Sequence, residues 1–197
     1  MPPKPKFDRD EIIAAALEIV REQGAEGLTT RNIGQRLGSS ARPIFTVFKN
    51  MEELTKEVRA AALRMYETYV VDREGNMSPF KQAGMRMLTF SLNEPKLYQL
   101  LFMHENKDAV TFDDVRGLLG KTADYCIDVL TDEYGLSPSV ANRLFENVWI
   151  YTYGIASMCA TGMCRFSKEK LSEMLTVEFT AMLKYLMSES NNEWYSA

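Results

Sequence analysis

The side chains best suited to chemistry in this sequence are basic, and they lie together between residues 28 and 50. Arg31, Arg36, Arg42 and Lys49 fall in this stretch, which contains no Asp or Glu and so carries a local charge of +4. Positive side chains bind phosphate groups, and an arginine can fork onto the two acceptors of a guanine edge. The stretch therefore predicts contact with a nucleic acid.

The rest of the chain has the opposite charge. The 197 residues carry a formal net charge of −4, and of the 23 basic and 27 acidic residues, 14 and 18 lie after residue 58. A negative chain is a poor nucleic-acid binder unless its cations are gathered in one place. We therefore expect a basic head on an acidic body.

The elements that position the basic stretch are short helices with clear ends. Asp8 and Glu11 form a capping-box-like start for a first helix, which Gly24 ends. Thr29 can cap a second helix, and Gly38 ends it where a left-handed residue is needed. A tight turn is expected to follow.

A third and a fourth helix are predicted after this turn. Ser40 is expected to cap the third helix, with Pro43 in its first turn, where a missing N–H does no harm. Asn50 with Glu53 is expected to cap the fourth helix. That helix runs to about Asp72 and is long enough to link a head to a body.

The remaining sequence predicts helices and no strands. Polar or prolyl breaks separate five helical segments at about 78–92, 95–104, 111–134, 138–164 and 168–188. The expected fold is all-α, with about nine helices: an N-terminal three-helix helix-turn-helix domain linked by a long helix to a C-terminal helical domain. The expected domains are residues 1–52 and 53–190, followed by a frayed tail at 191–197.

Two short helices joined by a glycine turn, the second free of acids, describe a helix-turn-helix whose second helix enters the major groove. With Ile44 and Phe48 packed inward, Arg42 must project outward, and we expect it to read bases. Hydroxyls, Lys49 and helix N-termini are expected to hold phosphates. The predicted DNA face consists of Thr30, Arg31, Ser39, Ser40, Arg42, Pro43, Phe45, Thr46, Val47, Lys49 and Asn50.

Five motifs occur over residues 9–54, in a register that holds without gaps. They are Gly24, Leu28-Thr29-Thr30-Arg31-Asn32-Ile33, Leu37-Gly38-Ser39-Ser40, Ile44-Phe45-Thr46-Val47-Phe48 and Glu52-Glu53-Leu54. In this order and spacing they resemble the head of the TetR family of transcriptional regulators. The resemblance implies a DNA-binding head and a C-terminal domain that binds a small effector.

Three departures from the family pattern fall on the DNA face. Phe45 stands where the family usually has Tyr, Met51 where it usually has Lys, and Pro43 where a small polar residue is common. Each removes a phosphate-binding group. We expect Arg42 and Lys49 to compensate.

The resemblance continues in the body. Residues 93–102 look like the short segment that follows the fifth helix in many members, and residues 149–154 are similar to a Trp-x-x-x-His-Gly pattern with Tyr153 in the His position. In the family two C-terminal helices pair with their symmetry mates, here 138–164 and 168–188. This implies a homodimer that places two recognition helices on a palindromic operator in double-stranded DNA.

Met, Phe and Tyr side chains of the body could line an adaptable pocket for a largely apolar effector. The plain alternative is that such residues at helical spacing form core or dimer interface. Polar groups such as Asn147 could orient a ligand or satisfy a buried hydrogen bond. The candidate ligand-binding residues are Met87, Phe102, Met103, Tyr125, Asn147, Tyr151 and Tyr153.

The sequence does not predict an enzyme, a cofactor or a metal site. His104 is the only histidine, and we expect it to cap a helix end, because a catalytic role would need partners at a recognisable spacing. Cys126, Cys159 and Cys164 fit neither a disulfide framework nor a zinc site. Cys159 and Cys164 are expected on different faces of one helix, which disfavours a redox pair.

We expect a cytoplasmic protein outside the membrane. The prolyl, basic N-terminus has no apolar run after it and so does not match a secretory signal. Residues 147–164 carry no charge and approach the length of a spanning helix, but their polar residues and glycines favour a buried helix. The expected function is a ligand-released repressor. The alternative is a small helical ligand carrier or enzyme that uses the apolar body.

Overall fold

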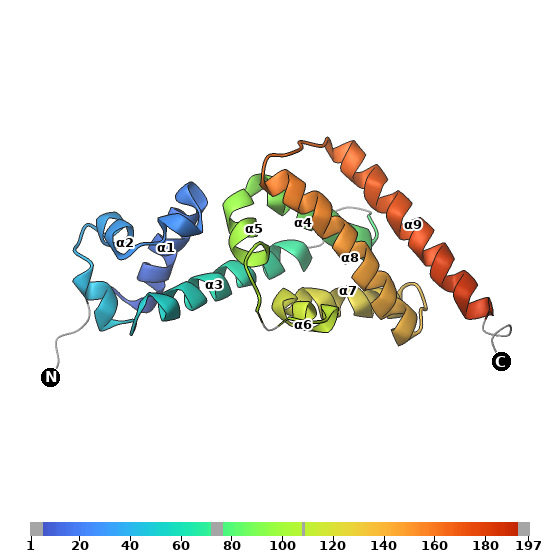
Figure 1. Cartoon of the computed structure of the whole chain (residues 1–197), viewed down its shortest axis with the longest axis horizontal. Coiled ribbons are helices and arrows are strands. Elements are labelled where there is room, and N and C mark those ends of the chain that lie inside the picture. Colours follow the sequence, from blue (N-terminus) through green and yellow to red (C-terminus); the bar gives the residue numbers. More distant parts are fainter. Residues whose placement is uncertain (1–5, 72–76, 108, 193–197) are drawn as a thin grey trace. The chain divides into compact units, whose positions relative to one another are not determined.

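The computed structural model describes residues 6–71, 77–107 and 109–192, and all regular structure in these ranges is helical (Figure 1). The predicted all-α fold is thus confirmed for the described residues, with nine α-helices and three 3-10 turns. The elements are α1 (Arg9–Gln23), η1 (Ala25–Gly27), α2 (Thr30–Arg36), η2 (Arg42–Thr46), α3 (Met51–Val71), α4 (Pro79–Asn93), α5 (Pro95–Phe102), α6 (Phe112–Arg116), η3 (Gly117–Leu119), α7 (Lys121–Asp132), α8 (Pro138–Ala160) and α9 (Lys168–Asn192).

The first two helices begin and end as their sequences predict. Asp8 and Glu11 form a reciprocal capping box at the start of α1. The Thr29 side chain accepts a hydrogen bond from the N–H of Asn32 at the start of α2. Gly24 and Gly38, which follow the two helices, have positive φ angles of 79° and 61°. Glycine alone adopts this left-handed backbone without a steric penalty.

The predicted third helix is a short 3-10 turn, η2, and the prediction that Ser40 caps it is wrong. The N-cap position is taken by Ala41, whose backbone is already helical (φ −67°, ψ −19°) and whose side chain cannot cap. A capping Ser needs an extended backbone at that position. The segment is also too short for an α-helical ladder, and the tighter 3-10 pattern suits pieces of this length.

The start of α3 is capped as predicted. The N–H of Glu53 donates to the Asn50 Oδ1 at 2.8 Å, and the Glu53 carboxylate in turn accepts from the N–H of Lys49 at 2.7 Å. These two hydrogen bonds satisfy backbone donors at and just before the helix start. They fix the residue at which α3 begins.

The chain divides into two compact units. The first contains the described residues up to Tyr66 together with Glu94–Glu105, so α5 belongs to the same unit as the N-terminal helices. In it α1 packs against α2 and α5. Its core is formed by buried apolar side chains, chiefly Ile12, Ala16, Ile19, Val20, Ile33, Ile44, Phe48, Leu54, Val58, Leu97 and Leu101.

The second unit contains Glu67–Asn93 and the described residues from Asn106 onward. Within it α8 packs against α4, α7 and α9, and α4 also contacts α7 and α9. Figure 1 shows α8 and α9 joined by a turn and running back along each other. The predicted boundary after residue 52 falls in the first turn of α3 and stays a prediction.

Three predicted helix limits in the body are wrong. The segment 111–134 is broken at Gly120 (φ 57°) into α6, η3 and α7. The α8 helix ends at Ala160, because Gly162 turns the chain with a φ of 73°. The α9 helix continues to Asn192, beyond the predicted end at 188, and the last five residues of the predicted tail lie outside the described residues.

None of the helices in the described residues is both long and apolar enough to cross a membrane. This finding includes α8, which contains most of the uncharged stretch noted above. Thr152 is buried in this helix and donates to the Val148 carbonyl.

Candidate nucleic-acid interface

The predicted DNA face is built on α2, η2 and the turns beside them. Arg31, Ser40, Arg42, Phe45, Thr46, Lys49 and Asn50 are exposed, whereas Thr30, Ser39, Pro43 and Val47 are partly exposed. Arg31 and Arg42 form no ion pair within the described residues. Arg36 is different, because its guanidinium is paired with Glu22 of α1.

Two buried side chains hold η2 against the head. Ile44 and Phe48 are each 1% exposed, which confirms their predicted inward direction. The N–H groups of Val47 and Phe48 both donate to the Ile44 carbonyl, at 3.1 and 2.9 Å. With these residues anchored, the intervening Phe45 and Thr46 point outward.

Arg9, which the sequence analysis did not single out, links α1 to this segment. Its guanidinium lies 4.4 Å from the centroid of the Phe48 ring. It also donates to the carboxylates of Glu53 at 2.9 Å and Glu57 at 3.2 Å. The sequence shows only that Arg9 directly follows the N-cap Asp8. Its contact with α3 follows from the fold.

The Glu53 carboxylate accepts hydrogen bonds from Lys49 and from Arg9. The Lys49 N–H and, next, the Arg9 side chain hold the pKa of the Glu53 carboxyl below its usual value. The group is therefore ionised at neutral pH, and the cap at the start of α3 is intact. Because these partners are solvent-exposed, we expect Glu53 to orient the segment more than to stabilise it.

Gly34 is a second residue that the sequence analysis missed. It is buried in the middle of α2, and a Cβ atom there would lie 3.0 Å from the Ser39 carbonyl oxygen and 3.0 Å from the Ser40 carbonyl carbon. The N–H of Ser39 donates to the Gly34 carbonyl at 2.8 Å. The turn before η2 thus packs directly on α2. An isolated glycine inside a predicted helix was the available signal.

Lys6 adds a cation to this surface. Its ammonium donates to the Ser39 hydroxyl at 3.3 Å and lies 5.2 Å from the centroid of the Phe7 ring. The basic N-terminal residues were noted in the sequence, but their position beside Ser39 follows only from the fold.

The candidate ligand-binding residues are divided between the two units. Phe102 and Met103 lie in the first unit, where the Phe102 ring contacts the rings of Tyr66 and Tyr98. The other five lie in the second unit. Asn147 is exposed and donates to the Arg143 carbonyl of its own helix, and the Tyr153 ring is stacked on Trp149. This ligand set stays a prediction.

His104 lies just after the C-terminal end of α5. The His104 ring interacts with the Leu101 carbonyl in the last turn of α5, as a C-terminal cap does. The prediction that Cys159 and Cys164 share a helix is wrong, because α8 ends at Ala160 and Cys164 follows the turn at Gly162. Burial is the main cause that raises the pKa of the Cys159 thiol.

The fold and this surface define a class: an all-helical protein with an N-terminal helix-turn-helix whose outward face is basic. A family profile described as "Bacterial regulatory proteins, tetR family" matches residues 12–58. This match covers the N-terminal part of the chain, so the head of the protein is similar to that of the tetR family.

Curated relatives match part of the chain. The tetracycline repressor protein class C of Escherichia coli is 32% identical over 87 residues, which is 40% of this chain and 40% of that protein. The class D repressor, also from E. coli, is 31% identical over 70 residues, or 36% of this chain and 32% of that protein. The match therefore spans less than half the length of these curated relatives.

Solved structures are similar over most of the chain. A TetR variant from Acinetobacter baumannii AYE in complex with minocycline has a TM-score of 0.61 at 20% identity, over 93% of this chain and 98% of that one. A TetR family protein from Vibrio parahaemolyticus has a TM-score of 0.63 at 19% identity, over 88% and 97%. At this identity the likeness establishes the fold.

Proposed function

We propose that this protein is a transcriptional regulator that binds operator DNA through η2 and the flanking turns, and that an effector releases it. The observation that carries the proposal is the basic surface itself. Arg31 and Arg42 are exposed, lack an acidic partner within the described residues, and stand on a helix-turn-helix of the tetR family. Such cations are free to exchange their counterions for DNA phosphates.

The direct test is fluorescence anisotropy of the protein on labelled DNA from its own upstream region, with random duplex as competitor. We expect preference for the upstream DNA and an affinity that falls steeply between two salt concentrations. Equal affinity for random duplex at moderate salt would contradict a sequence-specific regulator. It would favour the alternative of a carrier or enzyme that uses the apolar body.

Arg42→Ala separates these two functions. The variant should lose about 5- to 150-fold in operator affinity, the range expected for one bidentate contact with a guanine. It should also discriminate less well at one base position, as measured by anisotropy on single-base operator variants. Fold and thermal stability should not change, because Arg42 is exposed.

Lys49→Ala is the matched control for this prediction. A phosphate contact carries no sequence information, so the variant should bind all duplexes more weakly and lower the salt slope by about one. Arg42→Ala with unaltered discrimination would show that Arg42 does not read bases.

The proposed regulator acts as a homodimer through α8 and α9. These helices expose large apolar side chains that a monomer would leave in water, namely Ile150, Val177, Tyr185 and Met187. Exposed apolar side chains on these two helices support an association surface there. A twofold dimer would present two heads to a palindromic operator.

Val177→Glu tests this interface. Val177 is 62% exposed in the single chain, so a carboxylate there should not disturb the fold. Buried in an apolar interface it should raise the dimer dissociation constant at least about tenfold, because an unpaired charge is costly to desolvate. Sedimentation equilibrium measures this constant. Val110→Glu, at a site 90% exposed in the same unit but outside α8 and α9, should leave it unchanged.

The effector is proposed to bind in the second unit. The proposal is supported by the stack of Trp149 on Tyr153, whose ring centroids are 5.2 Å apart, and by the edge contact of Phe112 with Trp149. Aromatic side chains of this kind are common in small-molecule sites. Quenching of tryptophan fluorescence by a candidate effector would test it, with Trp149→Phe as the variant that should lose most of the signal.

A further inference from the structure

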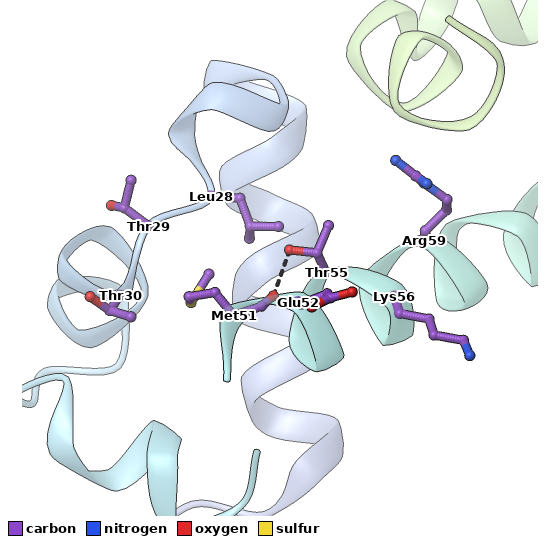
Figure 2. A pocket seen from close by; sticks show the side chains of 8 residues that line it. All are labelled: Leu28, Thr29, Thr30, Met51, Glu52, Thr55, Lys56 and Arg59. Carbon is purple, nitrogen blue, oxygen red and sulfur yellow. Dashed lines mark hydrogen bonds between the residues drawn. The ribbon is translucent and has the colours of Figure 1, made fainter. Parts of the chain in front are cut away.

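A hollow of about 730 Å³ opens in the first unit, beside the DNA-binding surface (Figure 2). Its volume lies within the range of about 300–1,000 Å³ that small-molecule sites occupy. Residues of α3 form one wall, and the entry to α2 forms the other. The lining side chains are Leu28, Thr29, Thr30, Met51, Glu52, Thr55, Lys56 and Arg59.

Arg59 is the unusual member of this lining. It is partly buried, and its Nε has no exposed surface and no hydrogen-bond partner. No acidic side chain in the described residues pairs with its guanidinium. Burial lowers the pKa of Arg59, and no neighbouring acid raises it. A buried guanidinium donor left without an acceptor costs free energy, which a bound anion would recover.

Among the described residues, the surroundings of Arg59 supply no negative charge that would compensate its own. His104 interacts with it, and this interaction, after burial, lowers the pKa of the His104 ring. Lys56 is a second cation of the lining, although Figure 2 shows its ammonium leaving α3 in a different direction from the guanidinium. Glu52 is the only acid of the lining, and it starts about 10 Å from Arg59 along the helix.

The other end of the hollow contains its two apolar side chains. Leu28 and Met51 face it, and Thr55 lies between them and Arg59, with its hydroxyl already donating to the Met51 carbonyl at 2.7 Å (Figure 2). The hollow therefore offers a cationic end and an apolar end, about 12 Å apart along α3 as measured from Met51 to Arg59.

We propose that this hollow binds a small organic anion. Its carboxylate or phosphate headgroup accepts hydrogen bonds from Arg59, and its apolar tail lies against Leu28 and Met51. The site is separate from the effector site proposed in the second unit. Thr30, which also lines the hollow, is on the predicted DNA face, but it lies at the end away from Arg59 (Figure 2). The tail of the anion, not its charge, would therefore lie nearest to the DNA.

The test is isothermal titration of the full-length protein with octanoate in the absence of DNA, so its outcome does not depend on whether the protein binds an operator. Octanoate should bind, and octanol, its neutral counterpart, should bind at least about tenfold more weakly. Arg59→Gln should weaken octanoate by at least about tenfold. Arg64→Gln, an exposed site on the same helix, should not.

A second variant gives an independent result in case Arg59→Gln does not fold. Thr55→Phe fills the middle of the hollow without removing a charge and should also abolish octanoate binding, while far-UV circular dichroism stays that of the native protein. Octanoate binding that survives both variants, or no binding to the native protein at millimolar octanoate, would overturn the proposal.

A further arm separates a free anion from a DNA phosphate. If Arg59→Gln lowers affinity for DNA and reduces the salt slope while the native protein does not bind octanoate, the occupant is the DNA backbone and the proposal fails. If octanoate binds through Arg59 but no DNA preference is found, this site stands and the proposed regulator does not.

Discussion

Phe48→Ala should lower the free energy of unfolding of the first unit by about 3–5 kcal/mol, the usual cost of removing a buried aromatic ring. The Phe48 ring is 1% exposed and lies under the guanidinium of Arg9. Its loss removes apolar contacts, leaves a cavity and removes the contact of the Arg9 guanidinium with the ring. Urea denaturation followed by circular dichroism measures the change.

The same variant should lose specific DNA binding. η2 is only five residues long and is anchored by Ile44 and Phe48, so it cannot keep its orientation by its own hydrogen bonds. Phe45→Ala is the matched control, because Phe45 is 49% exposed. It should change stability by less than about 1 kcal/mol. Equal destabilisation by both variants would show that Phe48 does not anchor the segment.

Gly34→Val should destabilise the first unit by roughly 3 kcal/mol, at the upper end of the usual cost of overpacking. Its Cβ would meet backbone atoms of Ser39 and Ser40 at 3.0 Å, and backbone cannot rotate away as a flexible side chain can. A helix gains at most about 1 kcal/mol when glycine is replaced by a better helix former. The clash therefore outweighs the gain in helix propensity.

This substitution should also displace the turn that leads into η2, so operator affinity should fall together with the unfolding free energy. Gly117→Val in the second unit is the control, because nothing lies within 4 Å of a Cβ there and its φ of −57° suits any residue. It should stay within about 0.5 kcal/mol of the native protein. If Gly34→Val is as stable as Gly117→Val in thermal denaturation, the turn does not rest on α2.

Most of the head could be predicted because its signals are local. A cap and its partner lie three residues apart, as do Asp8 and Glu11, Thr29 and Asn32, and Asn50 and Glu53. The inward direction of Ile44 and Phe48 follows from their helical spacing. The prediction for Ser40 was wrong because the backbone conformation of the next residue, Ala41, decided where η2 began.

The body was less predictable. Apolar spacing indicated helices over the correct regions, but it did not reveal the break at Gly120 or the end of α8 at Ala160. An apolar residue looks the same whether it faces its own core, a second copy or a ligand. The candidate ligand residues were chosen by type, and the fold divides them between two units.

The sequence by itself determined the likeness of the head to the tetR family, the helical class and the basic stretch, because each depends on residues close together in the chain. Tertiary structure decided what lies beside that stretch: the Ser39 turn on Gly34, Arg9 on Phe48, and Arg59 without an acidic partner among the described residues. Arg9 and Phe48 are 39 positions apart in the sequence. Only the packing of helices brings such residues together or leaves a charge unpaired.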